Sequence, residues 1–139
     1  MQFSKGGEPM RKLGMMIGAL CLSAGAAFAD PVEGTWKTEP GDTGGYLHVN
    51  VYGCGDAICG VIRNAYDKSG AAQPGYEHLN KRMLWDMQAE GGGQYGDGKI
   101  WAPDRGKTYN SKMSLNGNTL TVEGCVAVFC RGQTWTRVQ

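Results

Sequence analysis

The stretch "YLHVNVYGCGDAIC", residues 46–59, decides the fold class of this chain. Its apolar residues Leu47, Val49 and Val51 alternate with polar and aromatic residues, and a period of two is typical of a half-buried β-strand. Two cysteines follow, separated by a short run that contains glycine and aspartate. We therefore expect a strand that leads into a tight hairpin end.

Alternation is common elsewhere in the chain, whereas helical periodicity is nearly absent. Leu120 and Val122 alternate with threonine and glutamate, and Trp135 and Arg137 alternate with threonine and valine. Of the 23 glycines, 18 follow residue 29, as expected for short strands joined by tight turns. We expect an all-β chain of about eight strands in one antiparallel sheet, and such a sheet curls into a barrel or splits into a sandwich.

Turn signals separate the alternating runs. Asn116-Gly117-Asn118 and Gly96-Asp97-Gly98 are both typical of tight hairpins. In "GKIWAPDRGKTYN", residues 98–110, Pro103 and Gly106 suit the first and last positions of a turn, because proline presets φ and glycine tolerates positive φ. One strand should therefore end before Pro103, and the next should begin after Gly106.

The same stretch contains Gly106-Lys107-Thr108, which is also the end of a phosphate-binding P-loop. A P-loop needs a further glycine five residues earlier, where this chain has Trp101, and Pro103 stiffens the run. We therefore expect no nucleotide here.

The N-terminus has the pattern of a secretory signal peptide. Arg11 and Lys12 precede an apolar run over residues 13–28, which closes with the small-x-small signal Ala27-Phe28-Ala29. The run is shorter than the ~20 apolar residues that a membrane-spanning helix needs. We expect residues 1–29 to be removed, which leaves a periplasmic or otherwise exported protein without a membrane span.

The expected mature chain, residues 30–139, suits one small domain. Three of the 14 Lys and Arg and one of the 13 Asp and Glu precede it, so its net charge is −1. It has no basic stripe and no amphipathic membrane helix, so we expect neither nucleic acid nor a membrane surface as a partner. Its oligomeric state is left open, as is the choice between Met1 and Met10 as the start.

Four cysteines remain in this mature chain: Cys54, Cys59, Cys125 and Cys130. An even number in an exported protein indicates two disulfides. The equal spacing within "CGDAIC" and "CVAVFC" favours the local pairs Cys54–Cys59 and Cys125–Cys130 at hairpin ends, where facing Cβ atoms lie within disulfide range. Pairing between the two hairpins and a zinc site are the alternatives.

Residues 64–82, "NAYDKSGAAQPGYEHLNKR", are polar and show no clear period. We interpret them as a long connection with one helical turn near Tyr76 to Asn80. Long connections within small domains are often functional.

Two motifs at the ends of the expected domain favour the barrel. Gly34-Thr35-Trp36 opens the first strand and Trp135-Thr136-Arg137 closes the last. The set resembles the lipocalin-type (calycin) arrangement, in which a Gly-x-Trp packs under an arginine of the final strand. The resemblance implies that Arg137 stacks on Trp36 and closes the barrel, and a guanidinium over an indole gains ~0.5–2 kcal/mol.

Three further segments extend the resemblance: "CGDAICGVI" (54–62), "GKIWAPDRGKTY" (98–109) and "CRGQTWTR" (130–137). Together they resemble DUF2147, a family of small exported bacterial proteins of uncharacterised function with a lipocalin-like barrel. The resemblance covers nearly all of residues 32–138. The 64–82 connection departs from it, since it lacks the Asn-Pro-Asp type of segment that many members carry there.

Aromatic and histidine side chains are the candidate ligand-binding residues. An eight-stranded barrel can hold one small ligand, and ligand pockets are mostly apolar with a few polar groups. The predicted ligand-binding residues are Tyr46, His48, Tyr52, Trp85, Trp101 and Tyr109. The alternatives are that the aromatic residues pack in the core and that the polar face of His48 meets solvent.

We find no catalytic constellation in the sequence: serine nucleophile motifs are absent, and neither His48 nor His78 has a partner at metal-ligand spacing. We expect no catalytic residues, no metal and no cofactor. The favoured function is binding of a small apolar or amphipathic molecule in the barrel. A structural or interaction module of the cell envelope with a filled barrel, and an enzyme on an envelope component, are the alternatives.

Overall fold

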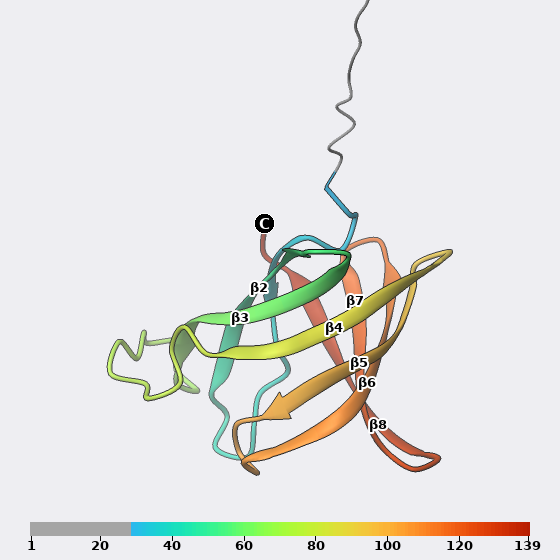
Figure 1. The fold of residues 1–139 in the computed structure, drawn as a ribbon. Coiled ribbons are helices and arrows are strands. Elements are labelled where there is room, and N and C mark those ends of the chain that lie inside the picture. Colours follow the sequence, from blue (N-terminus) through green and yellow to red (C-terminus); the bar gives the residue numbers. More distant parts are fainter. Residues whose placement is uncertain (1–28) are drawn as a thin grey trace, which may run out of the picture.

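Eight β-strands form within residues 29–139, the part of the chain that this computed structural model describes, and they close into one antiparallel barrel (Figure 1). The strands are β1 (Gly34–Lys37), β2 (Tyr46–Cys54), β3 (Ala57–Tyr66), β4 (Arg82–Gly91), β5 (Gln94–Ala102), β6 (Lys107–Asn116), β7 (Thr119–Val126) and β8 (Phe129–Arg137). Each strand pairs with its sequence neighbours, and β1 pairs with β8. The predicted all-β barrel of about eight strands is confirmed. Apart from Ala29, the expected signal peptide lies outside the described residues.

Alternation puts one face of each strand inside the barrel. Val49 and Val51 of β2 are fully buried, while their neighbours along the strand are only half-buried. Inward residues from the other strands join them in one cluster and fill most of the interior. The cluster consists of Val32, Trp36, Val49, Val51, Ile58, Ile62, Met83, Leu84, Met87, Tyr95, Met113, Leu120, Val122 and Trp135.

Trp36 and Arg137 join the first and last strands. They face each other in the β1–β8 register, and the guanidinium carbon of Arg137 lies 4.4 Å from the centre of the Trp36 ring. Arg137 also donates to the carbonyl oxygens of Glu33 (2.9 Å) and Pro31 (2.7 Å). The Trp36 indole donates to the carbonyl oxygen of Val32 at 2.8 Å. The predicted stacking is therefore present, and it ties the N-terminal segment across one end of the barrel.

Position 34 requires glycine, because the last residues of the chain pass too close to it for a side chain. Its φ is +137°, and a Cβ there would lie 2.5 Å from the Gln139 carbonyl oxygen and 2.8 Å from an Arg137 nitrogen. The glycine of the Gly-x-Trp motif is thus needed for the same closure that the tryptophan and arginine make.

The turn predictions are confirmed at two places and wrong at a third. β5 ends at Ala102 and β6 begins at Lys107, and β6 and β7 are joined through Gly117, as expected. Gly96-Asp97-Gly98, however, is a bulge inside β5, with a register shift between Tyr95 and Gly98, and the β4–β5 turn lies before it. The reason is that positive φ, which Asp97 adopts at 57°, occurs in some β-bulges as well as in hairpin turns.

The long connection is shorter than predicted, because β3 continues to Tyr66 and the connection covers only residues 67–81. The expected helical turn near Tyr76 is wrong: the segment forms non-helical turns, with the Leu79 amide donating to the Tyr76 carbonyl oxygen at 3.3 Å. Tyr76 and Leu79 pack against the barrel core, and this packing holds the connection against the barrel. No helix in residues 29–139 is long and apolar enough to span a bilayer.

Both disulfides are the local pairs that the sequence favoured. Cys54–Cys59 lies at the end of the β2–β3 hairpin and Cys125–Cys130 at the end of the β7–β8 hairpin. The alternatives, pairing between hairpins and a zinc site, are therefore wrong. Beyond the second disulfide, the β7–β8 tip projects from the barrel (Figure 1), and three of its apolar side chains are exposed: Val126 (62%), Val128 (86%) and Phe129 (78%).

Candidate functional site

A cavity of about 490 Å³ opens at the end of the barrel opposite the Trp36–Arg137 closure. Its wall comes from three connections, β1–β2, β3–β4 and β5–β6, and from the adjoining strand ends. The β1–β2 connection and the β5–β6 turn are visible together at the lower end of the barrel in Figure 1. Sheet closure thus brings together connections that are separated from one another in the sequence by two whole strands.

The floor of the cavity is apolar. Leu47 of β2, Ala65 of β3 and Met83 of β4 line it, and each belongs to the barrel core or packs against it. Deeper in the barrel, neighbouring side chains fill the space beside Gly60, since a Cβ on Gly60 would lie only 3.1–3.2 Å from Val49 and Leu84. The interior is therefore filled below the cavity, and the cavity is a shallow cup at the mouth.

Three tyrosines lie at the edge of the cup. Tyr46 of β2 and Tyr66 of β3 face each other in register, and their rings stack with centres 5.1 Å apart and planes 20° apart. Tyr76, from the β3–β4 connection, lies edge-on to His78 with ring centres 5.3 Å apart. The Tyr46–Tyr66 stack shares the outer strand face with His48, whose ring centre lies 4.7 Å from that of Tyr66, so Tyr76 is the tyrosine placed to offer its ring to the cavity.

Carboxylates form much of the remaining wall. Glu39, Asp67, Glu77 and Asp104 line the cavity, and none of the described lining residues is Lys or Arg. Two of the four carboxylates also hold the wall in place. Asp67 accepts hydrogen bonds from the Ser69 side chain and the Ala71 amide, which lower its pKa, and Glu39 accepts one from the Thr134 amide of β8.

Tyr76 lies close to the other two carboxylates. Burial raises the pKa of its hydroxyl, and the negative charges of Glu77 and Asp104 raise it further. The hydroxyl is therefore held even more firmly in the protonated form that tyrosine ordinarily has at neutral pH, in which it is a hydrogen-bond donor. His78 lies beside Glu77, with 3.6 Å between its Nε2 and the carboxylate.

Of the six predicted ligand-binding residues, the cavity contains one, Tyr46. His48 and Tyr52 lie on the opposite strand face to the buried Val49 and Val51, so they point out of the barrel. There His48 packs on Tyr66, with ring centres 4.7 Å apart. Burial and, secondarily, the Lys37 charge lower the pKa of His48.

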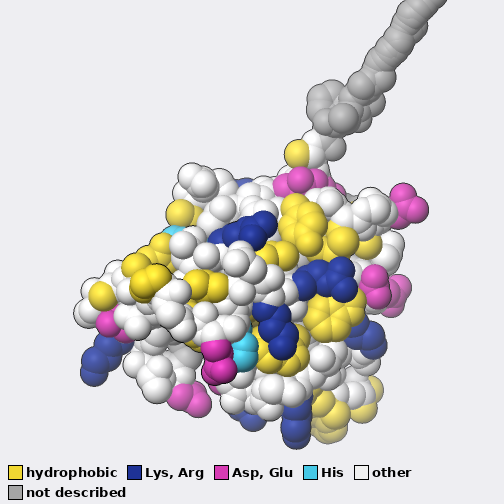
Figure 2. Space-filling model, turned by 60° about the vertical axis from the view of Figure 1, so that its left-hand side comes forward, with side chains coloured by type: hydrophobic (Ala, Val, Ile, Leu, Met, Phe, Trp, Pro, Cys, Tyr) yellow, Lys and Arg dark blue, Asp and Glu magenta, His cyan; other side chains and the backbone are white. Residues whose placement is uncertain are grey.

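A basic side chain lies over the ring of each of the two tryptophans that were predicted to bind ligand. The Lys81 ammonium lies 3.7 Å from the centre of the Trp101 ring, and the Arg82 guanidinium carbon lies 5.7 Å from that of Trp85. Figure 2 shows such a face, on which Lys and Arg side chains lie over and between hydrophobic ones. Tyr109, on β6, shares its strand face with the buried Ser111 and does not line the cavity.

Sequence reasoning missed Tyr66, Tyr76, His78 and Gln133 as cavity residues, and also all four carboxylates. A signal was available for the first three, since all lie within the polar 64–82 stretch, a long connection of the kind that is often functional. Nothing in the sequence pattern indicates Gln133, which reaches the wall only because β8 closes the sheet.

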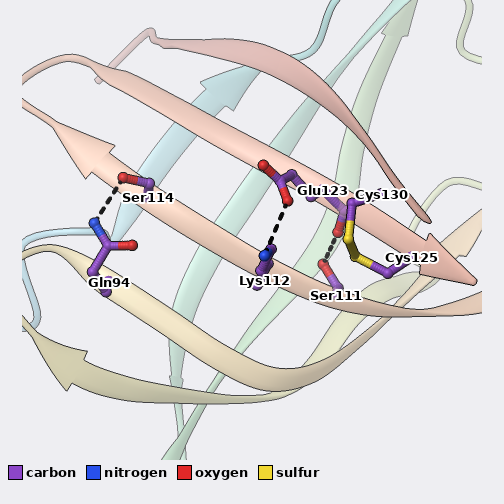
Figure 3. A network of polar contacts seen from close by, with 7 residues as sticks. All are labelled: Gln94, Ser111, Lys112, Ser114, Glu123, Cys125 and Cys130. Atoms are coloured by element: carbon purple, nitrogen blue, oxygen red, sulfur yellow. Dashed lines mark hydrogen bonds and ion pairs between the residues drawn. A yellow bond between two sulfur atoms is a disulfide. The ribbon is translucent and has the colours of Figure 1, made fainter. Parts of the chain in front are cut away.

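In the described part of the chain, one group of side chains has possible metal-ligand atoms close enough together to be considered as a metal site: Glu123, Cys125 and Cys130. The two sulfur atoms are bonded to each other (Figure 3), so neither is a thiolate ligand. Glu123 also pairs with Lys112 at 3.7 Å, and its carbonyl oxygen accepts from the Ser111 hydroxyl at 2.7 Å. This network holds β6 to β7 and has no ligand set for a metal.

Three comparisons bear on this architecture. A family model described as "Uncharacterized protein conserved in bacteria (DUF2147)" matches residues 34–137. Among solved structures, protein HP1028 of Helicobacter pylori, which belongs to the lipocalin family, aligns with a TM-score of 0.63 and 19% identity, over 78% of this chain and 83% of that one. At this identity the likeness shows the fold alone. No curated protein matches the chain.

Proposed function

We propose that this chain, which belongs to the DUF2147 family, binds a small amphipathic molecule in the cavity at the mouth of its lipocalin-like barrel. The observation that carries the proposal is the cavity itself. Its volume of about 490 Å³ falls within the range of small-molecule sites, roughly 300–1,000 Å³. It joins an apolar floor to a polar rim, which is the arrangement that an amphipathic ligand needs.

The packed interior limits the size and depth of the ligand. Because Trp36, Leu84 and Leu120 are fully buried within the core, a ligand reaches only the end of the barrel that carries the cavity. The head of the ligand would stay at the rim, next to Tyr76 and the carboxylates. The alternative of an entirely filled barrel is disfavoured by the cavity.

Binding without catalysis is part of the proposal. Among the described residues of the cavity wall there is no serine or cysteine nucleophile, and His78 is placed beside a carboxylate at the rim. Hydrogen bonds hold Asp67 within its own connection, which suits a structural role better than proton transfer.

We also propose that the protein acts after export, with residues 1–29 removed. Two disulfides support this, because disulfides persist in oxidising compartments such as the bacterial periplasm. The family is bacterial, which makes the periplasm the favoured location.

Native mass spectrometry of the protein purified from the periplasm of its own bacterium tests the proposal. We expect an added mass of a few hundred daltons, which is lost in Ala65→Phe, since Ala65 lines the cavity floor. Ala89→Phe, at an exposed position of β4 outside the cavity, is the matched control and should keep the added mass. Thermal melts establish that both variants fold. An added mass that survives Ala65→Phe in a folded protein places the ligand elsewhere and contradicts the proposal.

A further inference from the structure

We infer that the cavity selects ligands with a cationic head, such as a quaternary ammonium or an alkylamine, attached to an apolar tail. The inference rests on the proposed function and specifies its ligand class. It follows from the charges and rings at the rim and from the apolar floor below them.

The charge at the rim has one sign. Four carboxylates line the cavity, and none of the described lining residues is Lys or Arg. Glu77 and Asp104 come from different connections, β3–β4 and β5–β6, and both lie close enough to act on the Tyr76 hydroxyl. A ligand head beside Tyr76 would therefore meet negative charge from two sides, which favours a cation and disfavours an anion.

The rings at the rim provide the second half of the recognition. Aromatic faces attract cations, and quaternary ammonium groups are commonly held between such faces and carboxylates. Tyr76 lines the same cavity as the carboxylates. The rings around the mouth already hold cations of the protein itself: Lys37 lies 4.4 Å from the centre of the Tyr46 ring, and Lys81 lies 3.7 Å from that of Trp101.

Three lysines near the mouth must be weighed against this charge. Lys37 and Lys81 lie over aromatic rings, and neither lines the cavity. Lys68 packs its aliphatic stem against the β1–β2 connection, where a Cβ on Gly44 would lie 2.6 Å from the Lys68 Cβ, and it too is outside the lining. The surface that a ligand head would touch therefore stays acidic, while the cations lie around its outer edge.

The apolar floor supplies the place for the tail. Leu47, Ala65 and Met83 lie under the rim, and the packed core closes the space below them. A flexible side chain such as Met83 adapts to tails of different shape. The cup therefore suits a short or bent alkyl chain rather than a long extended one.

Titration calorimetry with three probes that share one short tail tests the inference: octyltrimethylammonium, octyl sulfate and octyl maltoside, each below its micelle concentration. We expect the ammonium probe to bind at least about tenfold more tightly than the sulfate, with the maltoside between them. Added salt should weaken ammonium binding and leave maltoside binding unchanged. Equal binding of the three probes, or preference for the sulfate, overturns the inference and leaves the proposed function standing. Binding of none of them contradicts both.

A double variant locates the effect at the rim. Glu77→Gln with Asp104→Asn should lose about tenfold in ammonium affinity and little in maltoside affinity. Asp86→Asn with Glu90→Gln removes the same charge from exposed positions of β4 outside the cavity, and it should leave both affinities unchanged. If the two double variants weaken ammonium binding equally, overall charge rather than the cavity explains the preference, and the inference fails. Melts of both variants establish that they fold. The salt titration is made on the parent protein, so it tests the inference even if a variant does not fold.

Discussion

At the scale of single residues, the closure of the barrel depends on a few side chains with several contacts each. Trp36 is fully buried, donates one hydrogen bond and lies under the Arg137 guanidinium. Arg137 in turn holds two backbone carbonyl groups of the N-terminal segment. The sequence predicted this pair because both residues lie in short, recognisable motifs at the chain ends.

We predict that Trp36→Ala destabilises the protein by ~3–5 kcal/mol, because it empties a large buried volume and leaves Arg137 without its ring. Arg137→Lys should cost less yet remain measurable, since lysine keeps the charge but loses the flat surface and the paired donors to Glu33 and Pro31. Urea unfolding of both variants checks the order. Unfolding curves that match the parent for both would remove the pair from the closure.

A pH prediction follows from His48. Its pKa in the folded protein is lowered from 6.5 by burial and by Lys37, so the unfolded chain binds its proton more readily. The contribution to stability is therefore complete above about pH 6.5 and is lost as the pH falls below that value. His48→Gln should flatten this part of the profile, measured as urea midpoints between about pH 7 and pH 5. An unchanged slope in the variant assigns the pH dependence to other groups.

At the scale of strands and turns, the sequence pattern was most informative where two signals agreed. Alternation and turn residues together located β2, β7 and the β5–β6 turn. Gly96-Asp97-Gly98 misled because positive φ serves a bulge as well as a turn, and only the pairing with β6 distinguishes them. The prediction of a helical turn near Tyr76 was wrong because tertiary packing of this segment against the core decides its conformation.

We predict that Cys125→Ser with Cys130→Ser costs less than about 3 kcal/mol, since the closed loop is short and the β7–β8 ladder holds the same register without the bond. The variant should keep its cavity and bind the ammonium probe like the parent. Denaturant unfolding and calorimetry check both statements. Loss of folding in the double variant would mean that the disulfide, rather than the ladder, sets the register of this hairpin.

At the scale of the whole molecule, the two ends of the barrel differ. One end is closed by the N-terminal segment over Trp36, and the other carries the cavity. This difference explains why the candidate site was only partly predictable. Alternation shows which residues share a strand face, but whether that face points inward depends on closure, so His48 and Tyr52 were assigned to the ligand although they point outward. Tyr66 and Tyr76 reach Tyr46 only through the register of β2 with β3 and the fold of the β3–β4 connection.

The closed end also suggests how export and folding are linked. The Asp30 carboxylate accepts hydrogen bonds from the Val32 amide and the buried Tyr95 hydroxyl, while the Asp30 amide donates to the Glu33 carboxylate at 3.1 Å. If export removes residues 1–29, that amide becomes a charged amino group beside Glu33, and a charged donor makes a stronger hydrogen bond.

We therefore predict that Glu33→Gln destabilises a form that begins at Asp30 more than a form that keeps residues before Asp30, because the carboxylate faces a full positive charge only in the former. The excess should disappear above about pH 8, where a free amino group loses its proton. Urea unfolding of the four proteins at about pH 6.5 and pH 9 measures it. N-terminal sequencing of the exported protein should begin close to Asp30. An equal cost of Glu33→Gln in both forms at the lower pH would show that the processed amino group does not contribute to the closure.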